Sequence, residues 1–176
     1  DVESNVYAES EELEEKFIKR IDELESAVQK RSARSVLSKY GIGPFYIKVT
    51  LKDDAGSGKG NAFVVETAPL NIMPHAIDHF LQMVEHKLWD GLTMVHRNIG
   101  SDVIHSSPLV TDTGEADEKR FQKAKLTQMS FTEHSKDYPM EKYSVVFEGR
   151  PGGPGFYIKM DSKVTALDVD TSESCF

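Results

Sequence analysis

Apolar residues near the N-terminus recur at the spacing of a helix. They lie three or four residues apart, and therefore on one stripe of an α-helix: Leu13, Phe17, Ile21, Leu24 and Val28. The pattern predicts one long helix over residues 9–39. Gly41 favours its end, because glycine is common just after a helix, and Pro44 prevents its continuation.

The same stripe leaves the role of this helix open. After Leu13, its apolar members hold alternate d and a positions of a heptad repeat, whereas Arg31 and Ser35 occupy the next two. Such a run is shorter than the three or four heptads of a secure coiled coil. Self-association through the stripe, docking on the chain's own domain and a solvated stalk all remain open. We divide the chain into an N-terminal amphipathic helix or stalk at 1–42 and a domain at 43–176.

From Phe45 onward the pattern changes to short strands rich in aromatic and β-branched residues. The first two flank a turn cluster at 53–60 and are expected to form a hairpin. The predicted strands are 45–51, 61–67, 92–96, 125–131, 142–147 and 156–160.

A second helix is predicted between these strands, over residues 74–89. Pro74 suits its first turn, and Gly91 stops it. Residues 98–125 are polar and irregular, with an exposed loop at 114–120. The tail from residue 161 onward is weakly patterned.

Charge and composition narrow the function classes. With 21 Lys and Arg against 29 Asp and Glu, the formal net charge of −8 argues against a nucleic-acid or anionic-membrane surface. No apolar run reaches the roughly 20 residues that span a bilayer, so no membrane segment is predicted within the chain. The single Cys175 excludes an intrachain disulfide and a multi-cysteine zinc site.

The N-terminal residues are compatible with more than one cellular compartment. The chain begins at Asp1 in an acidic segment without methionine, which suggests a processed or cut chain. The lumen of the secretory pathway or an organelle is therefore one option. The sequence does not decide whether a membrane anchor precedes Asp1.

Two motifs partly match known functional patterns, a phosphate-binding loop and a zinc-protease histidine pair, but each lacks a residue that the pattern requires. Residues 55–60 contain Gly-Ser-Gly-Lys-Gly, without the hydroxyl residue that a phosphate-binding loop places after its lysine. His75 and His79 are one helical turn apart, but Ala76 stands where a zinc protease has glutamate. We interpret the first motif as a hairpin turn and the histidines, with His86, as exposed helix residues. No metal and no cofactor are expected.

The order of the segments resembles the cyclophilins. Residues 94–97, Met-Val-His-Arg, are similar to the Phe-His-Arg strand that follows the first helix of this family. A strand, a glycine- and proline-rich turn and an aromatic strand then follow around Glu148–Ile158. The resemblance covers about residues 45–176. It implies a mainly β fold with helices, a cyclophilin-like antiparallel β-barrel preceded by the long amphipathic helix, and peptidyl-prolyl cis-trans isomerase activity.

The resemblance also implies a site. Arg97 matches the family's catalytic arginine, which hydrogen-bonds the carbonyl before the substrate proline and stabilises the twisted amide. Tyr157 matches the phenylalanine that lines the proline pocket, with Phe156 beside it. Phe147 stands where the family has a small alanine opening onto that pocket, and His96 precedes the arginine. The implied peptide-binding residues are therefore Tyr157, Phe147, His96 and Phe156.

Other family positions are not kept. Residues 98–105 lack the family's phenylalanine, methionine and glutamine, and Pro154 and Gly155 replace a serine and a glutamine. Phe147 is expected to fill the proline pocket. Ser174–Phe176 aligns with the start of a later family strand, so the barrel is expected to be incomplete at its C-terminal end. The chain is then a fragment, or another segment completes it.

The expected function is a divergent cyclophilin-like domain with an eroded active site, which binds a protein or a proline-containing peptide. One alternative is an active isomerase that uses Arg97. Another is a structural subunit of a larger assembly, joined through the helix at 9–39. Neither nucleic acid nor a cofactor is expected as a partner.

Overall fold

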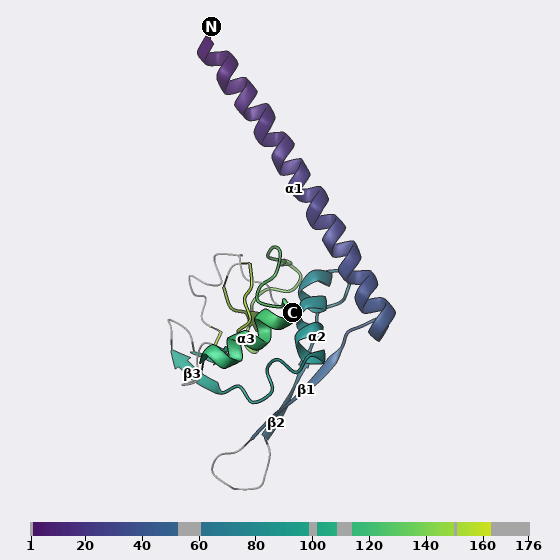
Figure 1. Cartoon of the computed structure of the whole chain (residues 1–176), viewed down its shortest axis with the longest axis vertical. Helices are drawn as coiled ribbons and strands as arrows, with labels where there is room; N and C mark the ends of the chain where they lie inside the picture. The colour runs from purple at the N-terminus through teal and green to yellow at the C-terminus, as the bar shows by residue number, and fades with distance from the viewer. Residues whose placement is uncertain (1, 53–60, 99–101, 109–113, 150, 163–176) are drawn as a thin grey trace.

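The computed structural model describes residues 2–52, 61–98, 102–108, 114–149 and 151–162 (Figure 1). The chain order is α1 (Val2–Tyr40), β1 (Tyr46–Leu51), β2 (Asn61–Glu66), α2 (Pro74–Glu85), β3 (Met94–Asn98), β4 (Asp102–Ser106), α3 (Gly114–Ala124), β5 (Val145–Phe147) and β6 (Phe156–Lys159). The predicted turn at 53–60 and the tail with Cys175 and Ser174–Phe176 lie outside the described residues.

The fold is mixed α/β rather than mainly β, with a long N-terminal helix followed by antiparallel sheets. Strands β1 and β2 form a two-stranded sheet, and the other four form a sheet of order β3-β4-β6-β5. The predicted succession of a long helix and antiparallel strands is therefore confirmed. The described strands form no closed barrel. No helix within the described ranges is long and apolar enough to cross a membrane.

Three predictions between residues 98 and 131 are wrong. Residues 102–106, which were expected to be irregular, form strand β4. The expected loop at 114–120 belongs to α3, and no strand forms at 125–131. The polar sequence of α3 conceals one fully buried side chain, Phe121, which anchors the helix to the core. Arg120 adds a contact with the carbonyl of Asp90 at 3.2 Å. Lys125 then takes a positive φ of 58°, which ends the helix.

The helix α2 ends earlier than predicted, at Glu85 rather than near residue 89. Lys87 has a φ of 53°, and the amide of Leu88 donates to the carbonyl of Met83. This left-handed residue with a bond back across the last turn is a common way to terminate a helix. Leu88 and Trp89 still pack on the core, so their apolar character reflects burial outside the helix.

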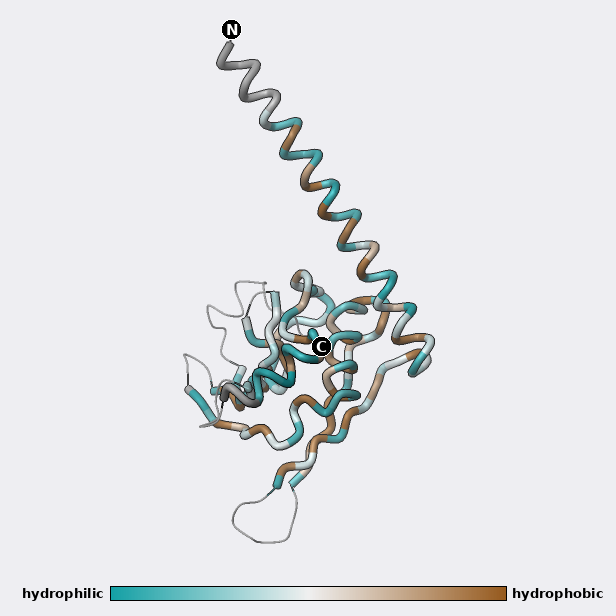
Figure 2. The backbone as a smooth tube through the Cα atoms, in the orientation of Figure 1, coloured by the Kyte–Doolittle hydropathy of each residue, from teal (hydrophilic) through white to brown (hydrophobic). Residues whose placement is uncertain are grey.

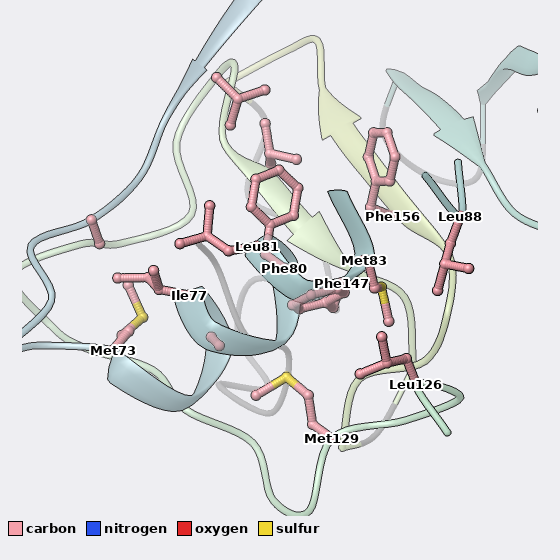
Figure 3. Close-up of a cluster of buried hydrophobic side chains, with 14 of the residues drawn as sticks. Met73, Ile77, Phe80, Leu81, Met83, Leu88, Leu126, Met129, Phe147 and Phe156 are labelled. Carbon is pink, nitrogen blue, oxygen red and sulfur yellow. The ribbon is translucent and has the colours of Figure 1, made fainter. Parts of the chain in front are cut away.

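The core lies between α2 and one face of the four-stranded sheet. Figure 3 shows its side chains, among them Ile77, Phe80 and Met83 of α2 with Phe147 and Phe156 of the sheet. Phe147 is completely buried. Pro74 begins α2 as predicted, and the helix buries eight of its residues, so it serves as the main cover of the sheet.

The helix α1 has two parts with different surroundings. Its C-terminal part packs beside α2, where Ser32 and Val36 are buried. Its N-terminal part projects from the domain (Figure 1), and apolar positions recur along it (Figure 2). The predicted stripe on this part is about half exposed, from 52% at Leu24 to 60% at Phe17. Docking and a solvated stalk therefore both occur, each in one part of the helix.

Candidate functional site

The four-stranded sheet has two faces, which the strand register separates. Ile104, Ile158 and Val145 lie in one row across the sheet and belong to the core beneath α2. His105, Tyr157 and Val146 lie in the next row. Because successive residues of a strand point to opposite faces, this second row faces away from α2. We call the side towards α2 the inner face and the opposite side the outer face.

The register divides the predicted site residues between these faces. Arg97 and Tyr157 share the outer face, with β4 between their strands. The other three belong to the inner side by the same alternation: His96, Phe147 and Phe156. The structure therefore brings together only part of the predicted set.

The inner-side members contact core residues or solvent. The ring of Phe147 lies 5.5 Å from that of His79, and the ring of Phe156 lies 5.0 Å from that of Trp89. The side chain of His96, on edge strand β3, is 67% exposed and has its Nε2 3.9 Å from a carboxylate oxygen of Asp102. Phe147 and Phe156 thus stabilise the core.

Tyr157 is covered where it lies on the outer face. Only 7% of the residue is exposed, and it forms a small cluster with Val103, Val146 and Met140. Its hydroxyl donates to the sulfur of Met140 at 3.6 Å. A ligand would have to displace Met140 to stack on this ring.

A carboxylate on the outer face was not foreseen from the sequence. Glu148 Oε2 lies 2.9 Å from Nε2 of His105, whose side chain is 6% exposed. The contact has the distance of an ion pair without the alignment of a linear hydrogen bond. A Cβ atom on Gly155 would overlap Glu148 Oε2 and crowd Ser107. Glycine at this position therefore gives the carboxylate its room.

The neighbours of Glu148 keep it ionised. Its pKa is lowered, first by the 2.9 Å contact with His105, then by the charge of His105, by Ser107 and by the charge of Arg97, against an opposing effect of partial burial. The carboxylate is thus shared by the histidine and the serine. A nucleophilic triad instead places the histidine between the serine and the acid, so this arrangement does not activate Ser107.

The helix histidines differ from their expected exposure. His75 and His79 are 8% and 6% exposed, and only His86 lies at the surface. His75 Nε2 accepts the amide of Ser130 at 3.1 Å, which requires a lone pair on that nitrogen. Burial lowers the pKa of both, that of His79 to about 4. The surrounding fold, which periodicity alone does not reveal, covers this end of α2.

The buried carboxylate of Glu133 joins the two helices. It accepts the amide of Ala76 at 2.7 Å and the side-chain amide of Gln29 at 2.9 Å. It therefore caps the first turn of α2 and holds α1 to it. Burial, the largest influence, raises its pKa despite these hydrogen bonds. We call these residues, with Ser32 and His75, the α1–α2 joint.

A large apolar cleft opens where the β1–β2 hairpin meets the inner face of the four-stranded sheet. Its volume is about 800 Å³. Consecutive residues 63–69, from β2 and the irregular segment after it, line the cleft. Residues 143–145, which lead into β5, line it as well. Met94, Ile104 and Ile158 line it from the sheet. We call this space the cleft.

The sequence pattern does not identify His105 and Ser107 as site residues, because it indicates irregular structure over residues 98–125. Glu148 begins the segment that resembles the cyclophilins, but that resemblance assigns it no role. Strand β4 is only five residues long and ends in polar residues, so it carries little strand signal. No group of three or more His, Cys, Asp or Glu in the described part of the chain could hold a metal ion. No protein-family model, curated protein or solved structure matches this chain.

Proposed function

We propose that this chain is a divergent cyclophilin-like domain that acts mainly as a protein- or peptide-binding module. Its ligand is an extended apolar segment held in the cleft. The order of α2, β3, β5, a turn and β6 supports the cyclophilin-like interpretation. So does the shared face of Arg97 and Tyr157. In a cyclophilin-like barrel that stays open between the β1–β2 sheet and the four-stranded sheet, a space such as the cleft would lie between the two sheets.

The cleft is the observation that carries this proposal. Its volume of about 800 Å³ lies in the range of small-molecule binding sites. Apolar side chains dominate its lining, with Tyr138, Pro139 and Tyr143 at exposed or half-exposed positions. Burying an apolar ligand against such a surface is favourable by about 25 cal/mol per Å².

The strand edges beside the cleft suit an extended ligand. In the described part of the chain, β2 pairs only with β1 and β5 only with β6. Each therefore has one side without a strand partner, and residues of both line the cleft. A peptide can add to such an edge through main-chain hydrogen bonds, while alternate side chains enter the apolar space.

The outer face supports binding over catalysis. Twisting a peptide bond has a barrier of about 18–20 kcal/mol, which a free cationic donor would lower by stabilising the twisted amide. Here the charge of Arg97 acts on the ionised Glu148, and Met140 covers Tyr157. The first feature weakens the ability of Arg97 to stabilise a twisted amide. The second blocks access of a proline ring to Tyr157.

Fluorescence anisotropy with labelled synthetic peptides tests the binding function. The probes are a short peptide of alternating valine and threonine, its backbone N-methylated form, and a proline-rich peptide. Strand addition predicts micromolar binding of the first and loss of binding for the second, because N-methylation removes the donors. If only the proline-rich peptide binds, the site recognises a polyproline helix and strand addition is wrong.

Two exposed residues lining the cleft provide the variants. Val64→Glu and Tyr143→Glu should each weaken binding by about tenfold or more, because each places a charge in an apolar site. Ile42→Glu is the matched control, since Ile42 is 86% exposed and does not line the cleft. No saturable binding of any probe, or equal binding by all variants, would overturn the proposal.

The second candidate is an active isomerase, favoured by the position of Arg97 and Tyr157 on one face. A proline-isomerisation assay on a tetrapeptide separates the two functions. Acceleration that is lost in Arg97→Ala and retained in Val64→Glu would support the enzyme and contradict a binding-only module. The binding proposal predicts a rate equal to the uncatalysed one for all three proteins.

A further inference from the structure

The projecting part of α1 carries an apolar surface that the domain does not cover. Five large apolar residues there are each between 52% and 60% exposed: Leu13, Phe17, Ile18, Ile21 and Leu24. Figure 2 shows their segment extending away from the rest of the chain. An exposed apolar row of this kind is a feature of surfaces that bind a partner.

The direction of this row leaves room for a second helix. Successive residues of a helix turn by about 100°, so Phe17 and Leu24 lie roughly a quarter turn from the mean direction of the docking residues Ser32 and Val36. Ile18 and Ile21 lie closer to the docking direction, but three or more turns nearer the N-terminus, where the helix projects from the domain. A helix can therefore approach the row without displacing the domain. In a two-fold symmetric pair, the two domains lie on opposite sides.

The heptad positions beside the row are complementary in a parallel pair. With Phe17 and Leu24 at d and Ile21 at a, the g positions are Leu13 and Arg20, and the e positions are Ile18 and Glu25. In a parallel dimer each g residue meets the e residue five positions later on the other helix. Leu13 then meets Ile18, and Arg20 meets Glu25. The a position before Phe17 is Glu14, which would face its own copy at the N-terminal end of the row.

An antiparallel pair loses this complementarity. Keeping Phe17 opposite Ile21 brings the two Arg20 side chains together, at a cost from like charges. Shifting the helices so that Ile21 meets Leu24 places Ile18 against Glu25 instead. The present partner of Arg20 is Glu23 at 3.0 Å, in a solvent-exposed pair worth at most about 1 kcal/mol, so Arg20 is available for a new contact.

The joint makes a short coiled coil feasible. An isolated helix of two heptads would have to be nucleated and ordered on association, which costs free energy. In this chain the C-terminal part of α1 is already held at α2, directly by Ser32 beside His75 and indirectly by Gln29 through Glu133. The dimer therefore needs to order only the projecting part.

We propose that the projecting part of α1 forms a parallel two-stranded coiled coil with a second copy of this chain. The dimer carries two domains with their clefts, so it doubles the binding sites for one assembly. The proposal rests on α1 alone and is independent of the function of the cleft.

Sedimentation equilibrium of the full chain over a micromolar range tests the proposal. The chain should reach a dimer, and Phe17→Ser or Ile21→Ser should raise the dimer Kd by about tenfold or more. Leu37→Ser is the matched control, because Leu37 is 50% exposed on another side of α1 and should leave the dimer unchanged. Circular dichroism should be used to check that each variant keeps the helix content of the wild type.

Charge variants and a cross-link test the orientation. Arg20→Glu and Glu25→Lys should each weaken self-association, and mixing the two proteins should restore a heterodimer in which both pairs attract. Leu24→Cys in a Cys175→Ser background should form an intermolecular disulfide, because equal d positions meet only in the parallel pair. A chain that stays monomeric throughout the range, a dimer insensitive to Phe17 and Ile21, or failure of this rescue would overturn the proposal.

Discussion

The α1–α2 joint and the cleft border the same hydrophobic core. The chain covers the apolar surface at the joint and leaves it exposed at the cleft. At the joint, a buried carboxylate and a buried imidazole have hydrogen-bond partners, and the chain covers its own apolar surface. At the cleft, apolar side chains of two sheets face a space of about 800 Å³. Apolar surface that the chain buries against itself stabilises the fold, whereas apolar surface that stays exposed is available to a ligand. Substitutions in the two regions should therefore act on different quantities.

The largest effect is expected at Phe147, in the closed part of the core. Phe147→Ala should reduce the free energy of unfolding by about 3–5 kcal/mol, because it removes a completely buried ring. Chemical denaturation measures this loss. An unchanged stability would instead support the expectation that Phe147 occupies a ligand pocket.

Glu133→Ala should have the next largest effect, about 2–3 kcal/mol on unfolding. The substitution leaves the amide of Ala76 and the side chain of Gln29 without their acceptor in a buried place. Glu133→Gln is the control and should lose less, because it keeps one oxygen acceptor and buries no charge. Equal losses for the two variants in denaturant melts would contradict the capping role.

Stability should fall by about 2 kcal/mol between pH 7 and pH 5 through His79. Its pKa is about 4 in the folded state and near 6.5 when unfolded, so the unfolded state binds more protons in this window. The raised pKa of Glu133 acts in the opposite direction, since that group takes up its proton more readily in the folded state. Comparing the wild type with His79→Leu isolates the histidine. An equally steep pH dependence in both proteins would exclude His79 as the cause.

The smallest stability change is expected at the cleft. Tyr143 is 63% exposed, so Tyr143→Glu should change the free energy of unfolding by no more than about 0.5 kcal/mol. The same variant should weaken peptide binding. Thermal melts beside the anisotropy titration separate the two effects, and a large loss of stability would remove the contrast between the joint and the cleft.

Long periodic segments could be predicted from the sequence. The stripe of α1 and the start of α2 at Pro74 follow from spacing and from proline chemistry. The short strand β4 and the polar helix α3 could not, because tertiary contacts such as the burial of Phe121 decide them. The same holds for the burial of His75 and His79, which depends on segments far away in the chain.

Strand alternation, which the sequence already shows, limits which of the predicted site residues can share a pocket. His96 and Arg97 are neighbours, as are Phe156 and Tyr157, and neighbours on a strand face opposite sides of a sheet. They therefore cannot all line one pocket. The contact between His105 and Glu148 depends on the register of three strands, which no local pattern supplies.

The most direct test of the binding function is an NMR titration of the ¹⁵N-labelled chain with the valine–threonine peptide. If the peptide binds in the cleft, the largest amide shift changes should occur at residues 63–67 and 143–145, which line it. Changes centred on Arg97, His105 and Tyr157 would contradict this prediction and assign the ligand to the outer face. A titration with no shift changes would contradict the binding function itself.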